Sequence, residues 1–159
     1  MFKTIPFLAF IGYTLGMRTV VFISCVSKKL PRPAKAQDLY ISPLFKLNLA
    51  YAKSLKPDKI FILSARHGLL GLNDRIAPYD TTLNTMPDKK WRVWGSKVMR
   101  QLRGKVNLEK DTFIFLAGGR YRKYLMPHMR RIKVPMMHLG IGEQLHFLKK
   151  NTRLKYGLR

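Results

Sequence analysis

The sequence predicts a single α/β domain with a mainly parallel, twisted sheet of about four to five strands flanked by helices. From Thr19 onward, short runs of β-branched and aromatic residues alternate with longer amphipathic stretches, as in sheets whose strands are joined by helical crossovers. The chain has 159 residues and 47% hydrophobic content, which is enough for one domain with its own core and too little for two ordinary domains.

The first half of the chain contains two of the expected strands and one helix. Residues 19–25, TVVFISC, predict the first strand, and residues 59–65, KIFILSA, predict the second. Between them, residues 42–55 carry apolar side chains near helical spacing. Ser42 and Pro43 suit the N-cap and the first position of that helix.

The second half of the chain continues the alternation with three helices and two strands. The expected elements, in chain order, are a helix at 88–104 between Pro87 and Gly104, a strand at 112–118, a helix at 120–132 interrupted by Pro127, a short strand at 134–140 and a helix at 142–155.

Residues 1–16 are expected to form an N-terminal extension, disordered or packed on the surface, before a single α/β domain at 17–159. One lysine and an apolar run give the extension the outline of a signal peptide, but no small-x-small cleavage site follows, and the run is too short to span a bilayer. The single cysteine, Cys25, excludes an internal disulfide and indicates a reducing compartment. We therefore expect a cytoplasmic protein.

The charge balance predicts a polyanionic partner. Thirty-one Lys and Arg residues face eight Asp and Glu residues, which leaves a net charge of +23 that disfavours the folded state unless a polyanion shares its surface. The basic residues are spread along the chain instead of gathering on one amphipathic helix, which argues against a membrane partner. The expected partner is a nucleic acid. In the leading hypothesis below, it is double-stranded DNA with an extruded base, bound by a monomer or a weak homo-oligomer.

Unusual polar residues follow each predicted strand, in segments 24–40, 64–70, 77–80, 117–122 and 140–144. In open α/β sheets, ligands bind beyond the carboxyl ends of the strands, so these segments predict a site at one edge. A single lysine in such a segment is more often a solvated surface charge. Several basic residues together with the glycines at the strand ends can bind phosphates. The expected DNA phosphate-binding residues are Lys28, Lys29, Arg66, Arg120, Arg122, Lys123, Gly140, Gly142 and Gln144.

Aromatic and hydroxyl side chains at the same edge are candidates for binding an extruded base. Flat rings beside cations are what base stacking requires. The expected base-binding residues are Tyr40, Tyr79, Ser42, Ser64 and Tyr121.

Three residues are catalytic candidates: Asp80, Asp38 and His67. His67 follows the second strand, where it can exchange a proton near neutral pH or merely tie a turn. Asp80 can stabilise a cationic sugar or form an Asx-turn, and Asp38 can take the same role or cap and pair locally.

The sequence lacks the motifs of several other chemistries. It contains no HExxH or closely spaced His and Cys set, no HxE with PCxxC and no GxxxxGK[ST], so no metal or other cofactor is expected. Eight scattered acidic residues also argue against a two-metal nuclease.

Residues 63–83, LSARHGLLGLNDRIAPYDTTL, resemble the "LSGLYG, then PY" stretch of the YaaA-like family, bacterial proteins linked to peroxide stress and DNA binding. FLAGGRYRKYLMP is similar to that family's "LAS-x-EY" strand end, and DLYISPLF, LSARHGLL and GIGEQL are similar to segments of its small relatives. The resemblance covers residues 19–148. The chain departs from the larger members in its length and in having His67 where they often carry tyrosine. The family-like positions are Cys25, Ser27, Lys28, Asp38, Tyr40, Ser42, Ser64, His67, Gly68, Tyr79, Asp80, Gly118, Tyr121, Gly142 and Gln144.

The resemblance implies an α/β domain with a basic cleft for DNA and, for some small relatives, excision of a modified base, including from phage DNA as antiviral defence. The leading hypothesis is therefore a DNA N-glycosylase in which Asp80 or Asp38 stabilises an oxocarbenium-like sugar, His67 steers a proton or hydrogen-bonds the base, and Tyr40 and Tyr79 stack on the flipped base. A lyase that uses Lys28 or Lys29 as an amine nucleophile is a further chemistry. The alternative is a non-enzymatic DNA-binding protein of the stress or nucleoid type. A third possibility is a hydrolase of free nucleosides, but that function would not explain the net charge of +23.

Overall fold

Strand β1 (Thr19–Ser24) lies at the centre of the sheet and is apolar on both faces, with four of its six residues buried. In the computed structural model, which describes residues 17–155, β1 runs parallel to β3 (Lys59–Ser64) on one side and to β6 (Thr112–Leu116) on the other. A strand of this composition needs cover on both faces, which the helices provide. The predicted fold class is confirmed: the chain forms an α/β domain with a five-stranded, mostly parallel sheet.

Two short strands close the edges of this sheet, in the order β4-β3-β1-β6-β7. β4 (Gly68–Gly71) pairs antiparallel with β3, and β7 (Arg131–Lys133) pairs parallel with β6. β4 was not expected from the sequence; it begins at Gly68, whose φ of +77° lets the chain turn back directly. A separate two-stranded sheet joins β2 (Ala34–Lys35) to β5 (Arg75–Ile76).

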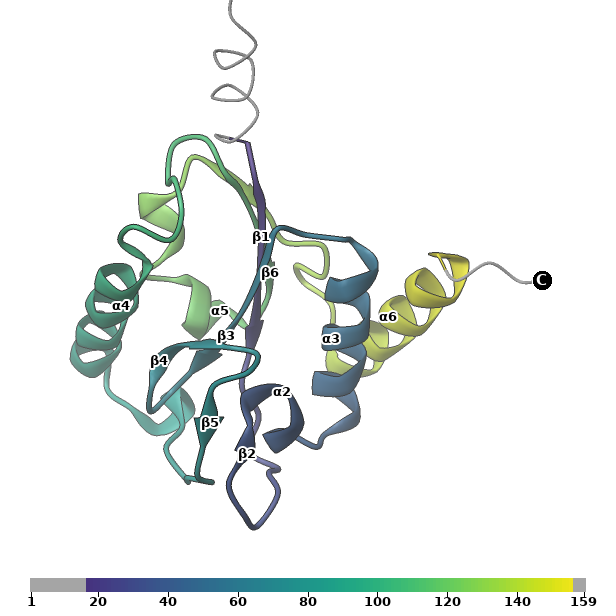
Figure 1. Cartoon of the computed structure of the whole chain (residues 1–159), viewed down its shortest axis with the longest axis horizontal. Helices are drawn as coiled ribbons and strands as arrows, with labels where there is room; N and C mark the ends of the chain where they lie inside the picture. The colour runs from purple at the N-terminus through teal and green to yellow at the C-terminus, as the bar shows by residue number, and fades with distance from the viewer. Residues whose placement is uncertain (1–16, 156–159) are drawn as a thin grey trace, which may run out of the picture.

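The helices form two layers around the sheet (Figure 1). α3 (Pro43–Ser54) packs against α6 (Ile141–Lys155) on one face, and α4 (Asp88–Leu102) and the short α5 (Gly119–Arg122) lie on the other. The expected N-cap of α3 is confirmed, because the Ser42 side chain accepts a hydrogen bond of 3.2 Å from the Phe45 backbone N–H. The remaining short elements are α2 (Ala36–Leu39), η1 (Leu83–Thr85) and η2 (Met126–His128).

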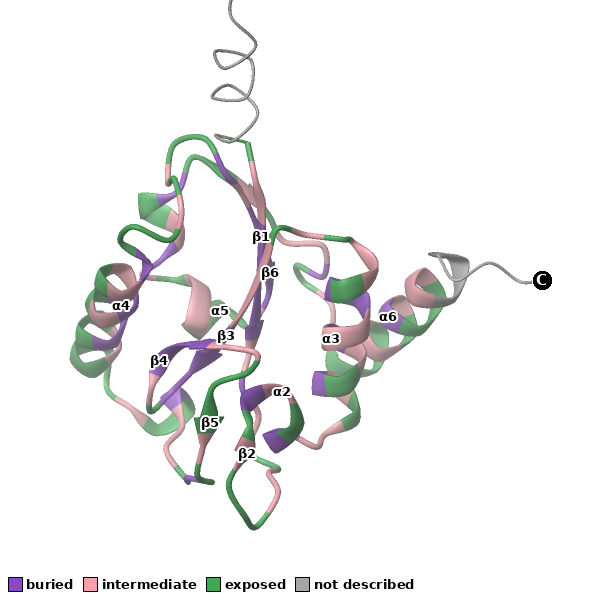
Figure 2. Cartoon of the chain, in the orientation of Figure 1, coloured by how far each residue is buried: buried purple, intermediate pink, exposed green. Residues whose placement is uncertain are grey.

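The hydrophobic core fills both faces of the three parallel strands, where the buried residues in Figure 2 are concentrated. Phe22 lies at its centre, with ring centroids 5.0 Å from Phe115, 5.9 Å from Phe113 and 6.1 Å from Phe61. Aromatic rings on three adjacent strands therefore tie the middle of the sheet together.

Two predicted elements near the C-terminal end are wrong. Residues 120–132 do not form one helix, because α5 ends at Arg122 and a separate 3₁₀ turn contains Pro127, which cannot donate a helical hydrogen bond. The fourth parallel strand is β7 and precedes the expected range 134–140, which forms turns around Pro135 and a positive φ of 69° at His138.

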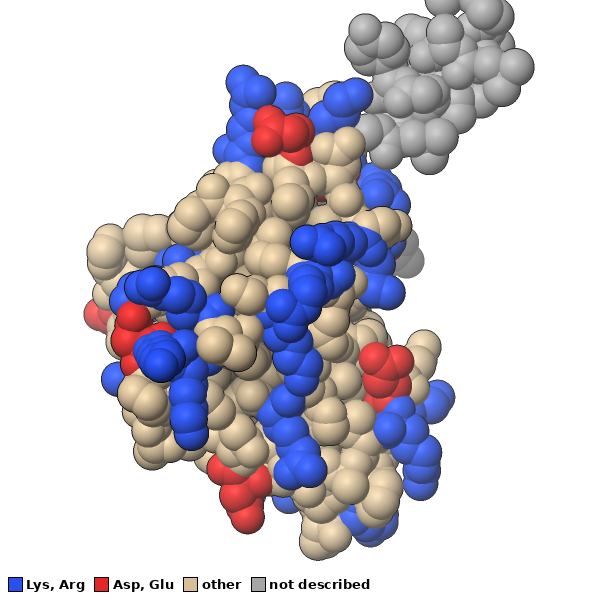
Figure 3. Space-filling model, turned by 90° about the vertical axis from the view of Figure 1, so that its left-hand side faces the viewer, with Lys and Arg blue, Asp and Glu red and all other residues tan. Residues whose placement is uncertain are grey.

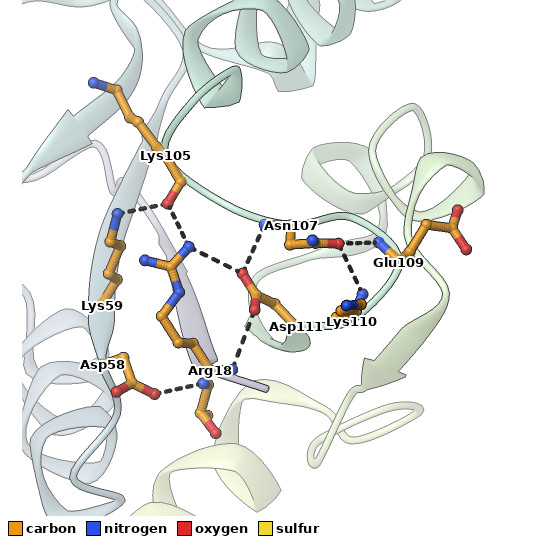
Figure 4. Close-up of polar contacts among 9 residues, drawn as sticks. Arg18, Asp58, Lys59, Lys105, Asn107, Glu109, Lys110 and Asp111 are labelled. Carbon is orange, nitrogen blue, oxygen red and sulfur yellow. Dashed lines mark hydrogen bonds and ion pairs between the residues drawn. The ribbon is translucent and has the colours of Figure 1, made fainter. Parts of the chain in front are cut away.

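The amino-terminal end of the sheet is held by a polar network around Asp111 (Figure 4). Asp111 is fully buried and accepts hydrogen bonds from the backbone N–H groups of Arg18 (3.1 Å) and Asn107 (2.7 Å), with the Arg18 guanidinium 3.6 Å away. Asp58 accepts from the Thr19 backbone N–H at 2.7 Å beside it. The Asp111 and Asp58 carboxylates therefore fix the start of β1 to the segments that precede β6 and β3. They lie at the opposite end of the strands from the carboxyl ends.

The expectation for residues 1–16 lies outside the described residues. Within residues 17–155, no helix combines the length and the apolar character that crossing a bilayer requires.

Candidate functional site

A pocket of about 770 Å³ opens at the carboxyl ends of β1 and β6. The chain leaves β1 through α3 on one face to reach β3, and it reaches β6 through α4 on the other face, so this is the topological switch point of the sheet. The volume lies in the usual range for small-ligand sites. The pocket is thus at the edge that the sequence predicts.

The pocket has a polar part and a mainly apolar part. The strand ends and the loops after them contribute the polar side chains Cys25, Ser27, Lys29, Asp80 and Tyr121. Elements on the face covered by α3 and α6 contribute Leu44, Val134, Met136, Leu139 and Ile141, together with the amides of Asn48 and Gln144. The apolar walls suit a flat heterocycle, and the polar strand ends suit a charged or reacting group.

Asp80 is the carboxylate that the pocket contains. Six of the eight acidic residues have hydrogen-bond or ion-pair partners: Asp58, Asp74, Asp88, Glu109, Asp111 and Glu143. Within the part of the chain that the structure describes, Asp38 and Asp80 have no such partner. Asp80 is exposed into the pocket, whereas Asp38 lies exposed in α2 outside the pocket lining. The structure therefore separates the two catalytic candidates and brings Asp80 alone to the site.

Lys29 is the lysine of the pocket lining, and its backbone is fixed on both sides. The Leu30 N–H donates to the Leu39 carbonyl at 2.9 Å, and the Ile41 N–H donates to the Lys28 carbonyl at 3.1 Å. The Lys29 Nζ lies 4.4 Å from the centre of the Tyr79 ring. Burial lowers the pKa of Lys29 from its ordinary value, opposed by the electrostatic effects of the Cys25 thiol and of Asp80.

Tyr79 and Tyr40 form a buried hydroxyl chain with Ser64 beneath the pocket. The Tyr79 hydroxyl lies 2.6 Å from the Tyr40 hydroxyl and 2.7 Å from the Ser64 Oγ. Burial raises the pKa of Tyr40 to about 12 and also raises the pKa of Tyr79, so both remain neutral. Tyr40 is 1% exposed and Tyr79 is 7% exposed, so neither ring has a free face. Their expected stacking on a base is therefore wrong, and both side chains support Lys29 from below.

The other expected base-binding hydroxyls differ in their positions. Ser64 is fully buried in the hydroxyl chain with Tyr79 and Tyr40, and the Ser42 hydroxyl caps α3. Neither serine is in the pocket lining. Tyr121 does line the pocket, and its hydroxyl lies 3.2 Å from the Cys25 Sγ. Of the expected base-binding set, only Tyr121 is placed to touch a ligand.

His67 lies behind the pocket instead of in its lining. Its backbone N–H donates to the Ser64 Oγ at 3.0 Å, and its ring packs edge-on against Tyr79 with centroids 5.4 Å apart. Burial, with Arg66 and Lys97 nearby, lowers the pKa of His67, so its ring is neutral at pH 7. These contacts fit the turn-forming role. Among the described residues the buried Nε2 of His67 has no hydrogen-bond partner, and its expected role in proton transfer stays a prediction.

The expected phosphate-binding cations fall into three groups. Arg122 and Lys29 line the pocket, and Lys28 and Arg66 are exposed outside it. Arg120 is engaged: its guanidinium donates to the Leu83 carbonyl at 3.3 Å and to the Asn84 carbonyl.

Lys123 is likewise engaged, in an ion pair of 2.8 Å with Asp88. Arg120 therefore ties α5 to η1, and Lys123 ties the end of α5 to the start of α4, while phosphate binding by these two residues stays a prediction. Both remain at the surface, so their charge still contributes to the field around DNA.

The N-terminus of α6 is already occupied by a carboxylate of its own helix. The Gly140 N–H donates to Glu143 Oε2 at 3.0 Å, which places a negative charge where a phosphate was expected. The Gly140 N–H is therefore engaged within the chain, and phosphate binding by Gly142 stays a prediction. Gln144 lines the pocket and donates from Nε2 to the Leu139 carbonyl at 2.9 Å, which fixes its amide.

Asn48 is a pocket residue that sequence reasoning missed. It lies in the middle of α3, is 5% exposed, and its buried Oδ1 has no hydrogen-bond partner. A buried amide oxygen without a donor is costly, which marks it as a group that a ligand can satisfy. The available signal was an amide on the apolar stripe of the helix, four residues after Leu44 and four before Ala52.

Basic side chains form a band and a separate group on the face of the molecule that carries α4, with acidic side chains at several places around them (Figure 3). The exposed cations of α4 and its C-terminal turn are Lys89, Lys90, Arg92, Arg100 and Arg103.

Within residues 17–155, no group of three or more His, Cys, Asp or Glu side chains lies together as a metal site requires. The site therefore offers a carboxylate, an amine and amides in a cationic surrounding.

Comparisons with known proteins describe relatives without a defined activity. A family model described as "Family of unknown function (DUF6884)" matches residues 20–150. The "Uncharacterized protein YfjM" of Bacillus subtilis (strain 168) is 29% identical over 153 residues, which cover 89% of this chain and all of that protein. No solved structure gives a significant match.

Proposed function

Because the chain belongs to the family of unknown function DUF6884, we propose its activity from the pocket: it is a DNA N-glycosylase that hydrolyses the N-glycosidic bond of a modified nucleobase. The observation that carries the proposal is Asp80. It is the carboxylate of the pocket lining, it is exposed into the pocket, and no hydrogen bond or ion pair within residues 17–155 engages it.

Hydrolysis of an N-glycosidic bond passes through a sugar with oxocarbenium character. A carboxylate near the anomeric carbon stabilises that positive charge and can orient the attacking water. Asp80 is placed for this role at the polar end of the pocket. No metal ion is needed for such a step, because the carboxylate supplies the negative charge and water is the nucleophile.

The apolar part of the pocket suits the extruded base. Leu44, Val134 and Met136 can cover its faces, and the amide of Asn48 can hydrogen-bond to its edge, which satisfies the unpartnered Oδ1. The Asn48 amide oxygen can accept a hydrogen bond from an exocyclic amine, which adenine, guanine and cytosine all carry, so cytosine derivatives are among the bases that fit this contact. The sequence resemblance to small YaaA-like relatives adds modified cytosines of phage DNA as the substrates to test first.

The cationic surface supports DNA as the carrier of that base. Arg122 and Lys29 at the pocket are placed for the phosphates that flank an extruded nucleotide, and the exposed cations outside it are available for the rest of the duplex. A monomer acting on DNA in the cytoplasm completes the proposal.

The spread of cations beyond the pocket favours a second candidate, a non-enzymatic DNA-binding protein (Figure 3). Both candidates predict DNA binding that weakens steeply as salt rises. They differ in chemistry, because only the glycosylase leaves abasic sites behind.

The deciding experiment incubates the full chain with phage DNAs that carry different cytosine modifications and with unmodified DNA. Released bases are identified by mass spectrometry, and abasic sites are detected by alkaline cleavage. We expect release of one class of modified base and none from unmodified DNA. DNA binding without any release from this panel would support the non-enzymatic candidate and overturn the glycosylase.

A further inference from the structure

We propose that Lys29 is the amine of an abasic-site lyase, which cleaves the DNA strand at the site that base release leaves behind. This inference rests on the proposed function, because base release supplies the aldehyde on which the amine acts. It adds a second reaction to the same pocket.

The position of Lys29 carries the inference. It is the lysine that the pocket lining contains within residues 17–155, next to Ser27 and in the same pocket as Asp80. The backbone on both sides of it is tied to the segment before α3, through Leu30 to Leu39 and through Lys28 to Ile41. The neighbouring Lys28 is exposed and outside the pocket lining, so the structure distinguishes the two lysines that the sequence left equivalent.

The surroundings of Lys29 favour an amine that can act as a nucleophile. Its Nζ lies 4.4 Å from the Tyr79 ring centre and 5.7 Å from the Tyr40 ring centre, where the side chain is partly shielded from water. Burial lowers its pKa against the opposing electrostatic effects of Cys25 and Asp80, which shifts the balance towards the free amine, and its Nζ donates to the Ser27 carbonyl at 3.2 Å. The two rings are themselves fixed by the hydroxyl chain to Ser64, so the amine rests on a rigid base.

The reaction balances with water as its only other participant. The Lys29 Nζ adds to the C1′ aldehyde of the ring-opened abasic sugar, and the adduct loses water to form a protonated imine. Asp80 takes a proton from C2′, the electron pair of that C–H bond forms the C2′=C3′ bond, and the C3′–O bond breaks as the 3′ phosphate leaves. Water then hydrolyses the imine, which returns the free amine and releases the unsaturated aldehyde.

The test uses the full chain and a duplex oligonucleotide in which an abasic site has been prepared in advance, with sodium borohydride present. Borohydride reduces the imine to a stable amine, so we expect a covalent protein–DNA adduct, located by mass spectrometry to the peptide that contains Lys29. The prepared abasic site makes the adduct independent of base release.

Lys29→Arg is the diagnostic variant, because it keeps the positive charge but cannot form the imine efficiently. We expect this variant to lose the adduct and the strand cleavage on the prepared abasic duplex, measured at a protein concentration that saturates duplex binding in both proteins. Lys46→Gln is the matched control on the exposed surface of α3, and we expect it to form the adduct like the original chain. Circular dichroism establishes that each variant is folded.

Two results would overturn the lyase. One is the absence of any adduct with the original chain, and the other is an adduct that persists in Lys29→Arg or maps to the terminal amine or another lysine. Base release without an adduct would overturn the lyase and leave the glycosylase proposal standing. An adduct at Lys29 without base release would overturn the glycosylase proposal and leave the lyase standing.

Discussion

The hydroxyl groups of Tyr79 and Tyr40 share a hydrogen bond of 2.6 Å inside the core, although the two residues are 39 positions apart in the sequence. Ser64 extends the chain from Tyr79 at 2.7 Å. Because Tyr79 precedes Asp80 and its ring supports Lys29, this buried contact links the core to the carboxylate and the amine of the pocket lining. The hydroxyl chain is thus the structural support of the site.

Replacement of Tyr79 by Phe should destabilise the protein by about 1–3 kcal/mol, because the hydroxyls of Tyr40 and Ser64 lose a partner inside the core. Urea unfolding followed by circular dichroism measures this loss. Tyr124→Phe is the matched control, since the hydroxyl of Tyr124 donates to the exposed Asp88, and we expect it to change the free energy of unfolding by less than about 0.5 kcal/mol. Equal losses in the two variants would contradict the support role.

Replacement of Asp80 by Asn should lower base release about 10²- to 10⁴-fold, the range that a positioned acid–base group supplies, and should leave duplex binding within a few-fold. Asp38→Asn should release bases at the original rate, because Asp38 lies outside the pocket. Single-turnover base release and fluorescence anisotropy give the two readouts. A loss of release in Asp38→Asn with normal release in Asp80→Asn would reverse the assignment.

Replacement of Asn48 by Leu should separate activity from stability. The substitution removes a buried amide whose Oδ1 has no partner, so the free energy of unfolding should stay constant or rise. Base release should fall roughly 10- to 100-fold, corresponding to about 1–3 kcal/mol for one base contact. Urea unfolding and single-turnover release are measured on the same preparation. A destabilised variant with normal release would show that Asn48 serves the fold.

Removal of the Asp111 side chain by Ala should destabilise the protein by about 3–5 kcal/mol, because it leaves Arg18 and two backbone N–H groups without their acceptor. Glu109→Ala is the control, since Glu109 forms an exposed ion pair with Arg130 at 3.6 Å, and such pairs contribute about 0–1 kcal/mol. Thermal and urea unfolding compare the two. Similar losses would mean that the network in Figure 4 does not anchor the strands.

The free energy of unfolding should decrease as the pH falls below about 6.5, in part because of His67. Burial, Arg66 and Lys97 lower the pKa of His67 in the folded protein, so the unfolded chain takes up the proton first and is favoured at lower pH. The other three histidines, at positions 128, 138 and 146, are exposed. Urea unfolding at several pH values between 5 and 8 should show a shallower slope in His67→Gln. An identical slope would contradict this assignment.

The strands and the location of the site could be predicted because they depend on local patterns. The apolar runs at β1, β3 and β6 allow few other structures, and parallel strands bring their carboxyl ends, with Lys29 and Asp80, to one edge.

The roles of individual side chains depend on contacts that no local pattern contains. The segment with Tyr79 folds back onto Tyr40, which buries two rings that the sequence suggested for stacking. Glu143 occupies the start of its own helix, where glycines indicated a phosphate site. Asn48 can be recognised as a pocket residue only from the folded structure, in which α3 borders the pocket.

The Asp111 network and the pocket lie at opposite ends of the same strands. Substitutions at the pocket therefore need not loosen the anchors of the sheet, and substrate preference can be changed by altering side chains such as Asn48 while the scaffold stays intact. Under the proposed glycosylase function, the pocket residues Thr81, Thr82 and Asn84 are natural places to randomise when other modified bases are sought.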